Sequence, residues 1–99
     1  MFTLYGAAKL KVPGGKLVSV KLTFDKSIEK IQILGDFFIN PEEALVEIEK
    51  SISGASISEG KEGIATRVAR AAHLNHAEFI GVTPDSIAEA IFLAIGNGG

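Results

Sequence analysis

The stretch VPGGKLVSVKLTF, from Val12 to Phe24, decides the fold, because it joins a turn signal to an alternating strand. Every second residue of its latter half is apolar: Val18, Val20, Leu22 and Phe24. A period of two is typical of a strand with one buried face. Pro13 ends the preceding strand, and Gly14 and Gly15 tolerate the positive φ that a tight hairpin turn requires. The stretch therefore predicts two antiparallel strands joined by a short turn.

The same turn resembles a fragment of a phosphate-binding loop, because a lysine, Lys16, follows its two glycines. A phosphate loop needs four residues between its glycines and then Gly-Lys-Ser/Thr opening a helix. Here the glycines are adjacent, Leu17 follows the lysine, and a strand comes next. We therefore interpret the segment as a hairpin turn with Lys16 at its edge, where an exposed lysine usually contacts water and could also reach a partner.

Two further segments complete the predicted sheet. Residues 2–12 carry apolar side chains at even positions, and residues 28–39 alternate around Ile31 and Ile33. With a strand over residues 16–25, they predict a three-stranded antiparallel meander.

Helical patterns follow the strands. Asn40 and Pro41 are typical of a helix start, and the stripe Leu45, Ile48 and Ile52 continues to Gly54, which suits the position past a helix end. Residues 55–63 are small and polar, which predicts a loop.

Two more helices are expected. Their apolar residues are Ile64, Val68 and Ala71 or Ala72 for one, and Ile87, Ile91, Ala94 and Ile95 for the other, which opens at Thr83-Pro84. We predict one α+β domain over residues 1–95, with about three helices on one face of the sheet and a flexible glycine-rich tail over 96–99.

Composition excludes several functions. The chain has 99 residues and no cysteine, so it has no disulfide, thiolate nucleophile or cysteine-held metal cluster. The net charge is −2 with ten scattered Lys and Arg residues, which gives no basic stripe for nucleic acid. We see no signal peptide and no apolar run long enough for a membrane span, so a cytoplasmic protein is expected.

No active site can be recognised from the residues alone. His73 and His76 lie three apart, but two imidazoles make a poor metal site, and a polar helix end is favoured. For Arg67 and Arg70 a solvated face is favoured over an anion or partner contact. No carboxylate pair stands isolated in apolar surroundings, so acid–base catalysis is not indicated.

The segment LGDFFINPEE, Leu34 to Glu43, is unusual because Phe37 and Phe38 are neighbours. In a strand they point to opposite faces, and a sheet covered on one side buries only one of them. Either something outside the meander covers the other face, or the strand bends at Gly35. Two interpretations stay open: both rings tuck under the domain's own helices, or one ring is an anchor in a protein interface.

Nearly the whole chain, about residues 9–95, resembles the accessory domain of lipoate–protein ligases. The resemblance rests on VPGGKLVSVKLTF, on IEKIQILGDFFINPEEALVEIEKSISG and on IGVTPDSIAEAIFLAI, in this order and spacing. In archaea this domain is a separate small protein beside a catalytic subunit. The resemblance implies an α+β fold similar to the iron–sulfur scaffold superfamily, without that superfamily's cysteines.

The resemblance further implies a non-catalytic subunit of a heterodimer, needed when the catalytic subunit activates lipoate with ATP to lipoyl-adenylate. Lipoate, ATP and magnesium are expected on the catalytic subunit, and no cofactor on this chain. Lipoyl acceptor domains are indirect partners; nucleic acid and membrane are not expected. The candidate interface residues are Gly14, Gly15, Lys16, Gly35, Asp36, Phe37 and Phe38. The alternative is a stand-alone small-molecule binding or carrier module; an autonomous enzyme comes third.

Overall fold

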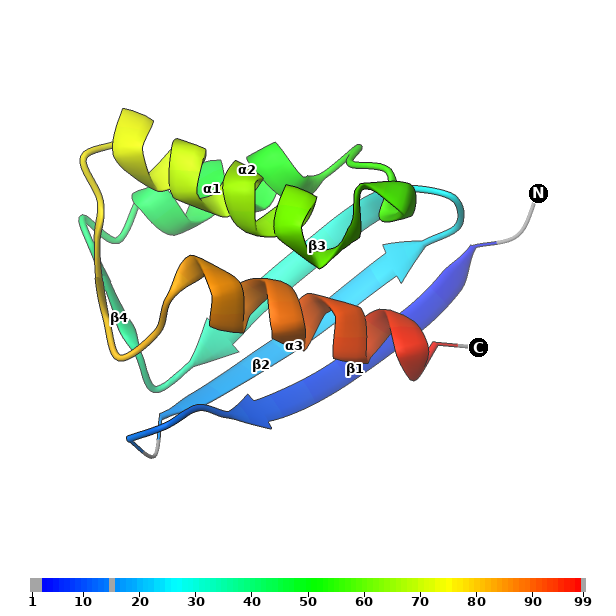
Figure 1. The fold of residues 1–99 in the computed structure, drawn as a ribbon, viewed down its shortest axis with the longest axis horizontal. Coiled ribbons are helices and arrows are strands. Elements are labelled where there is room, and N and C mark those ends of the chain that lie inside the picture. The colour runs from blue at the N-terminus through cyan, green and yellow to red at the C-terminus, as the bar shows by residue number, and fades with distance from the viewer. Residues whose placement is uncertain (1–2, 15, 99) are drawn as a thin grey trace.

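A computed structural model describes residues 3–14 and 16–98 as a sheet layer and a helix layer (Figure 1). The sheet is antiparallel in the order β1-β2-β3, with strands Leu4–Lys11, Leu17–Phe24 and Ile28–Gly35. Helices α1 (Ala44–Ile52), α2 (Gly60–Leu74) and α3 (Pro84–Gly96) lie on one side of it. The α+β fold with a three-stranded meander is thus confirmed. The expected similarity to the iron–sulfur scaffold superfamily stays a prediction.

The core lies between the two layers. On the central strand β2, Val18, Val20 and Leu22 are buried against the helices, as their alternation predicts. Each helix supplies buried isoleucines to the same core: Ile48 and Ile52 from α1, Ile64 from α2, Ile87 and Ile91 from α3. Because these side chains recur every three or four residues, each helix presents one apolar face to the sheet or to its neighbour.

The third strand is four residues shorter than predicted. It ends at Gly35, where a Cβ atom would lie 2.1 Å from the Leu17 carbonyl oxygen. Asp36 then closes the end of the β2–β3 pair: its N–H donates to the Leu17 oxygen over 3.2 Å, and its carboxylate accepts from the Leu17 N–H. The chain bends here, so the Phe pair does not continue β3.

The residues after the bend form a second sheet, which their local pattern did not predict. Strand β4 (Phe38–Asn40) pairs antiparallel with β5 (Glu78–Ile80). Three residues are too few for a readable alternation, so β5 left no recognisable pattern. The prediction that Asn40 caps the first helix was wrong: Asn40 pairs with Glu78 in this ladder, and α1 begins at Ala44.

The predicted loop over residues 55–63 was also wrong. It contains a 3₁₀ turn, η1 (Ile57–Glu59), and the first turn of α2. The small polar residues act as caps: the Ser56 side chain accepts from the Ser58 N–H over 3.2 Å, and the Glu59 carboxylate accepts from the Ser56 N–H. Polar composition alone does not distinguish a loop from a capped helix start.

The start of α3 was predicted correctly. Thr83 caps the helix by accepting from the Ser86 N–H over 3.1 Å, and Pro84 occupies the first turn. At the other end α3 includes Gly96, and the Asn97 amide donates to the Ala7 carbonyl of β1 over 3.2 Å. No helix in the described part of the chain has the length and apolarity needed to cross a membrane.

The close contact at Gly35 generates a stability prediction. Gly35→Ala places a methyl group against the Leu17 carbonyl and the Phe37 ring, so we expect it to lower the free energy of unfolding by about 1–3 kcal/mol. Gly96→Ala is the matched control, because no atom lies within 4 Å of that Cβ position and alanine favours the helix. Urea unfolding measures both, and equal stability of the two variants would contradict the assignment.

Candidate functional site

The predicted interface residues gather at one end of the molecule, although they come from three separate segments. The β1–β2 turn, the end of β3 and the strand β4 meet there (Figure 1). Gly14 has a φ of 97°, as the turn prediction requires, and Asp36 binds Leu17, the first residue of β2. Gly15 lies outside the described residues. The structure thus brings Gly14, Lys16, Gly35, Asp36, Phe37 and Phe38 together at this end.

Lys16 also ties the turn to the second sheet. A Cβ atom on Gly81, directly after β5, would lie only 2.9 Å from Cγ of Lys16. The aliphatic stem of Lys16 therefore lies over a glycine, and the lysine is partly buried rather than free in water. This contact could not be predicted from the residues, because 65 positions along the chain separate Lys16 from Gly81.

The two phenylalanines have different surroundings. Phe37 is partly buried and packs against the core, whereas Phe38 is 64% exposed. Phe38 pairs with Ile80 across the β4–β5 ladder, so their side chains share a face, and Ile80 is also exposed. This observation excludes the alternative in which both rings tuck under the helices, because one ring packs against the core and the other projects outward; the interface role of Phe38 stays a prediction.

Phe38 belongs to a larger apolar surface. It lines, together with the exposed Leu34, a hollow of about 430 Å³ at the end of β3. We call Leu34, Phe38 and Ile80 the apolar end patch. The hollow is lined by Ile33, Leu34, Gly35, Phe37, Phe38, Ile39, Glu42 and Leu45. An exposed aromatic ring beside an apolar hollow is the arrangement in which protein interfaces place an anchor and its pocket.

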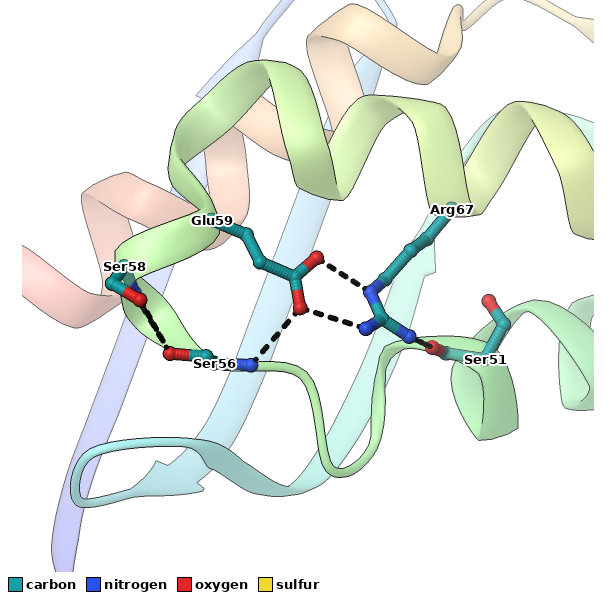
Figure 2. Close-up of polar contacts among 5 residues, drawn as sticks. All are labelled: Ser51, Ser56, Ser58, Glu59 and Arg67. Carbon is teal, nitrogen blue, oxygen red and sulfur yellow. Dashed lines mark hydrogen bonds and ion pairs between the residues drawn. The ribbon is translucent and has the colours of Figure 1, made fainter.

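A larger groove, of about 680 Å³, runs between α1 and α2, and a polar network occupies one side of it. Figure 2 shows Arg67 of α2 in a two-pronged pair with Glu59, with both N–O distances 2.7 Å. The third guanidinium nitrogen donates to the Ser51 carbonyl at the end of α1 over 3.1 Å. The Arg67 side chain thus links α1, η1 and α2 by hydrogen bonds. The interpretation favoured from the sequence, a solvated face, does not account for these contacts.

This pair also shifts the titration of both partners. The hydrogen bonds from Arg67, helped by its charge, hold the pKa of the Glu59 carboxyl below its ordinary value of 4.5. Reciprocally, the hydrogen bonds to Glu59 raise the pKa of Arg67. Arg70 lines the same groove.

The histidines do not share a helix face. His73 lies in the last turn of α2, which ends at Leu74, and His76 lies beyond it with a φ of 53°. Across residues 3–14 and 16–98, no three His, Asp or Glu side chains are grouped in a way that would hold a metal ion.

Comparison with known proteins gives one informative similarity. The chain is similar to a chain in the solved structure of an archaeal lipoylation system, a bipartite lipoate protein ligase and its E2 lipoyl domain from Thermoplasma acidophilum. The two are 26% identical, the match covers 91% of this chain and 94% of that chain, and the TM-score is 0.68. No family model and no curated protein matches this chain. The resemblance inferred from the sequence motifs therefore has an independent structural counterpart.

The Arg67–Glu59 pair generates a pH prediction. A carboxyl whose pKa is lowered by folding contributes stability above its unfolded pKa, and this contribution is lost as the pH falls through the folded pKa. We expect Arg67→Ala to lower the urea midpoint at pH 7 and to differ less from the wild type below pH 4.5. Arg70→Ala is the control, with little effect at either pH. A difference that stays constant with pH would contradict the role of the pair.

Proposed function

We propose that this chain is the small, non-catalytic subunit of a two-part lipoate–protein ligase. The observation that carries the proposal is the match to the Thermoplasma system, which spans nearly the whole of both chains at 26% identity. The apolar end patch supports it, since an exposed aromatic residue beside an apolar hollow suits a subunit interface.

The chemistry proposed for the complex has two steps. The lipoate carboxylate attacks the α-phosphorus of ATP, which releases pyrophosphate and gives lipoyl-adenylate. The amine of an acceptor lysine then attacks the lipoyl carbonyl, forms the amide, loses a proton and releases AMP. Both steps belong to the catalytic subunit, which would hold lipoate, ATP and magnesium.

The small subunit has a physical task in the first step. Adenylate formation needs the carboxylate and ATP held in alignment, and the mixed anhydride must be shielded from water. A rigid domain docked at the rim of such a site orders its loops without donating a reacting group. In this chain Arg67 and Glu59 bind each other, so neither is offered to a substrate. The apolar end patch is exposed and is therefore the surface that suits docking.

The hollow beside Phe38 also suits a second function, that of a small-molecule binding or carrier module. Its volume of about 430 Å³ and its apolar lining suit a small apolar ligand. A ligand retained by the purified chain without any ligase would favour this alternative.

Reconstitution tests the proposed function directly. The catalytic subunit alone should form lipoyl-adenylate slowly from lipoate and ATP, and addition of this chain at equal concentration should raise the rate. Mass spectrometry of this chain after the full reaction is the control, because an accessory subunit keeps its mass and an acceptor domain gains a lipoyl group. Unchanged adenylation would refute the proposal.

The apolar end patch generates a second test. Phe38→Ala should raise the Kd for the catalytic subunit by about tenfold or more, as removal of an interface anchor does. Val46→Ala is the matched control, because Val46 is 50% exposed but lies on α1, beside the opposite end of β3. Both variants should keep the wild-type urea midpoint, and equal affinities for the two would exclude Phe38 as an anchor.

A further inference from the structure

The face of the sheet opposite the helices carries a concentration of positive charge that the sequence did not reveal. Register places four lysines there: Lys9 and Lys11 on β1, Lys21 on β2 and Lys30 on β3. All four are exposed. They are half of the chain's eight lysines, although the net charge is −2, so the negative charge lies mostly elsewhere. The cations that looked scattered in the sequence are therefore gathered by folding.

The four lysines form a diagonal stripe, which we call the lysine face. Lys9 and Lys11 are two residues apart on β1. Lys21 of β2 pairs with Ala7, which is two residues along β1 from Lys9. Lys30 of β3 pairs with Thr23, which is two residues along β2 from Lys21. Diagonal neighbours in a sheet are about 7–8 Å apart, close enough for like charges to repel. The stripe thus crosses all three strands at some cost to the isolated domain.

Among the described residues, none of these four lysines forms an ion pair with a carboxylate. The other residues that the strand register pairs on this face are uncharged: Tyr5, Ala7, Leu17, Ser19, Thr23, Gln32 and Leu34. One carboxylate, that of Glu29, belongs to β3 itself beside Lys30 and accepts from the Thr3 hydroxyl, while Asp36 follows the strand and accepts from the Leu17 N–H. The ion pairs among the described residues are Lys50–Glu47 and Arg67–Glu59, both in the helix layer.

Protection of a sheet edge does not explain this pattern. Lysines on edge strands hinder unwanted strand pairing, which accounts for Lys9, Lys11 and Lys30. Lys21 lies on β2, the central strand, which is paired on both sides and has no free edge. Its place in the stripe suits a charged contact across the face.

We propose that the lysine face receives the lipoyl acceptor domain during transfer of the lipoyl group, and that carboxylates on the acceptor meet these lysines. This inference rests on the proposed function. Four exposed lysines on one face favour fast, salt-sensitive association, and Tyr5 and Leu34 add exposed apolar area to the same face. An acceptor must arrive and leave in each turnover, whereas the catalytic subunit stays, and the apolar end patch at the end of β3 suits the lasting contact.

Nucleic acid is the less fitting occupant. The face has no arginine, the residue that binds phosphate with two hydrogen bonds, and its aromatic side chain among the described residues is Tyr5 alone. Four lysines separated in this way suit carboxylates spread over a protein surface.

The test compares two double charge reversals in the reconstituted ligase. Lys9→Glu with Lys21→Glu reverses charge on the lysine face, and Lys26→Glu with Lys61→Glu makes the same change in net charge off it. Urea unfolding shows whether the charge reversals disturb folding. If they do, the double variant Lys9→Gln with Lys21→Gln replaces them, because it removes the two charges without reversing them. The readouts are adenylation without acceptor, and transfer from lipoyl-adenylate at varied acceptor and salt concentrations.

We expect the face reversal to raise the KM for the acceptor domain by about tenfold or more and to weaken its salt dependence, with a smaller rise for the glutamine variant. Adenylation should match the wild type in every variant. An unchanged KM, or an equal rise in the off-face control, overturns the proposal.

Two other results would also overturn it. Loss of adenylation in the face variant would assign the face to the catalytic subunit, and lysine-dependent binding of a single-stranded oligonucleotide would assign it to nucleic acid. Failure of the wild-type chain to stimulate adenylation removes the proposed function itself, so the two failures are distinguishable.

Discussion

One-sided burial of the central strand β2 is the constraint on which the structure depends. Val18, Val20 and Leu22 are buried against the helix layer, while Ser19, Lys21 and Thr23 lie on the other face. Because the side-chain period of a strand is two, a slip of one residue would bury Lys21 and expose the valines. Pairing on both sides of β2 carries this register to β1 and β3, and the helices cover the only face that is apolar enough to bury.

The same constraint divides the surface into regions with different physical character. The face away from the helices collects lysines, since every second residue of three strands points there. The end of the sheet is apolar because Gly35 stops β3 and the chain turns into β4, which leaves Phe38 exposed. Between the helices, Arg67 donates hydrogen bonds to the Glu59 carboxylate and to the Ser51 carbonyl oxygen. A lasting apolar contact and a transient charged one would therefore fall on adjoining parts of one small domain, which meet at Leu34.

Much of the fold could be predicted from local patterns, and apart from the loop over residues 55–63 the errors share one cause. The β1–β2 hairpin, the α3 start at Thr83 and the stripes of α1 and α2 follow from residues close together in sequence, and the structure confirms them. The end of β3, the start of α1 and the strand β5 were missed because each depends on a distant partner. Gly35 meets Leu17, and Asn40 pairs with Glu78, which holds it in a strand and away from a cap position.

The candidate site divides in the same way. The sequence by itself determined the α+β class, the turn at Gly14 and the resemblance to a ligase accessory domain, because these rest on local spacing and on the order of motifs. Only the tertiary structure decided that Phe38 projects and Phe37 does not, that Lys16 lies over Gly81, and that four lysines share one face. The physical reason is that the exposure of a side chain and its distance from others depend on how separate strands pair. The pairing register of two strands cannot be predicted from the sequence of one of them.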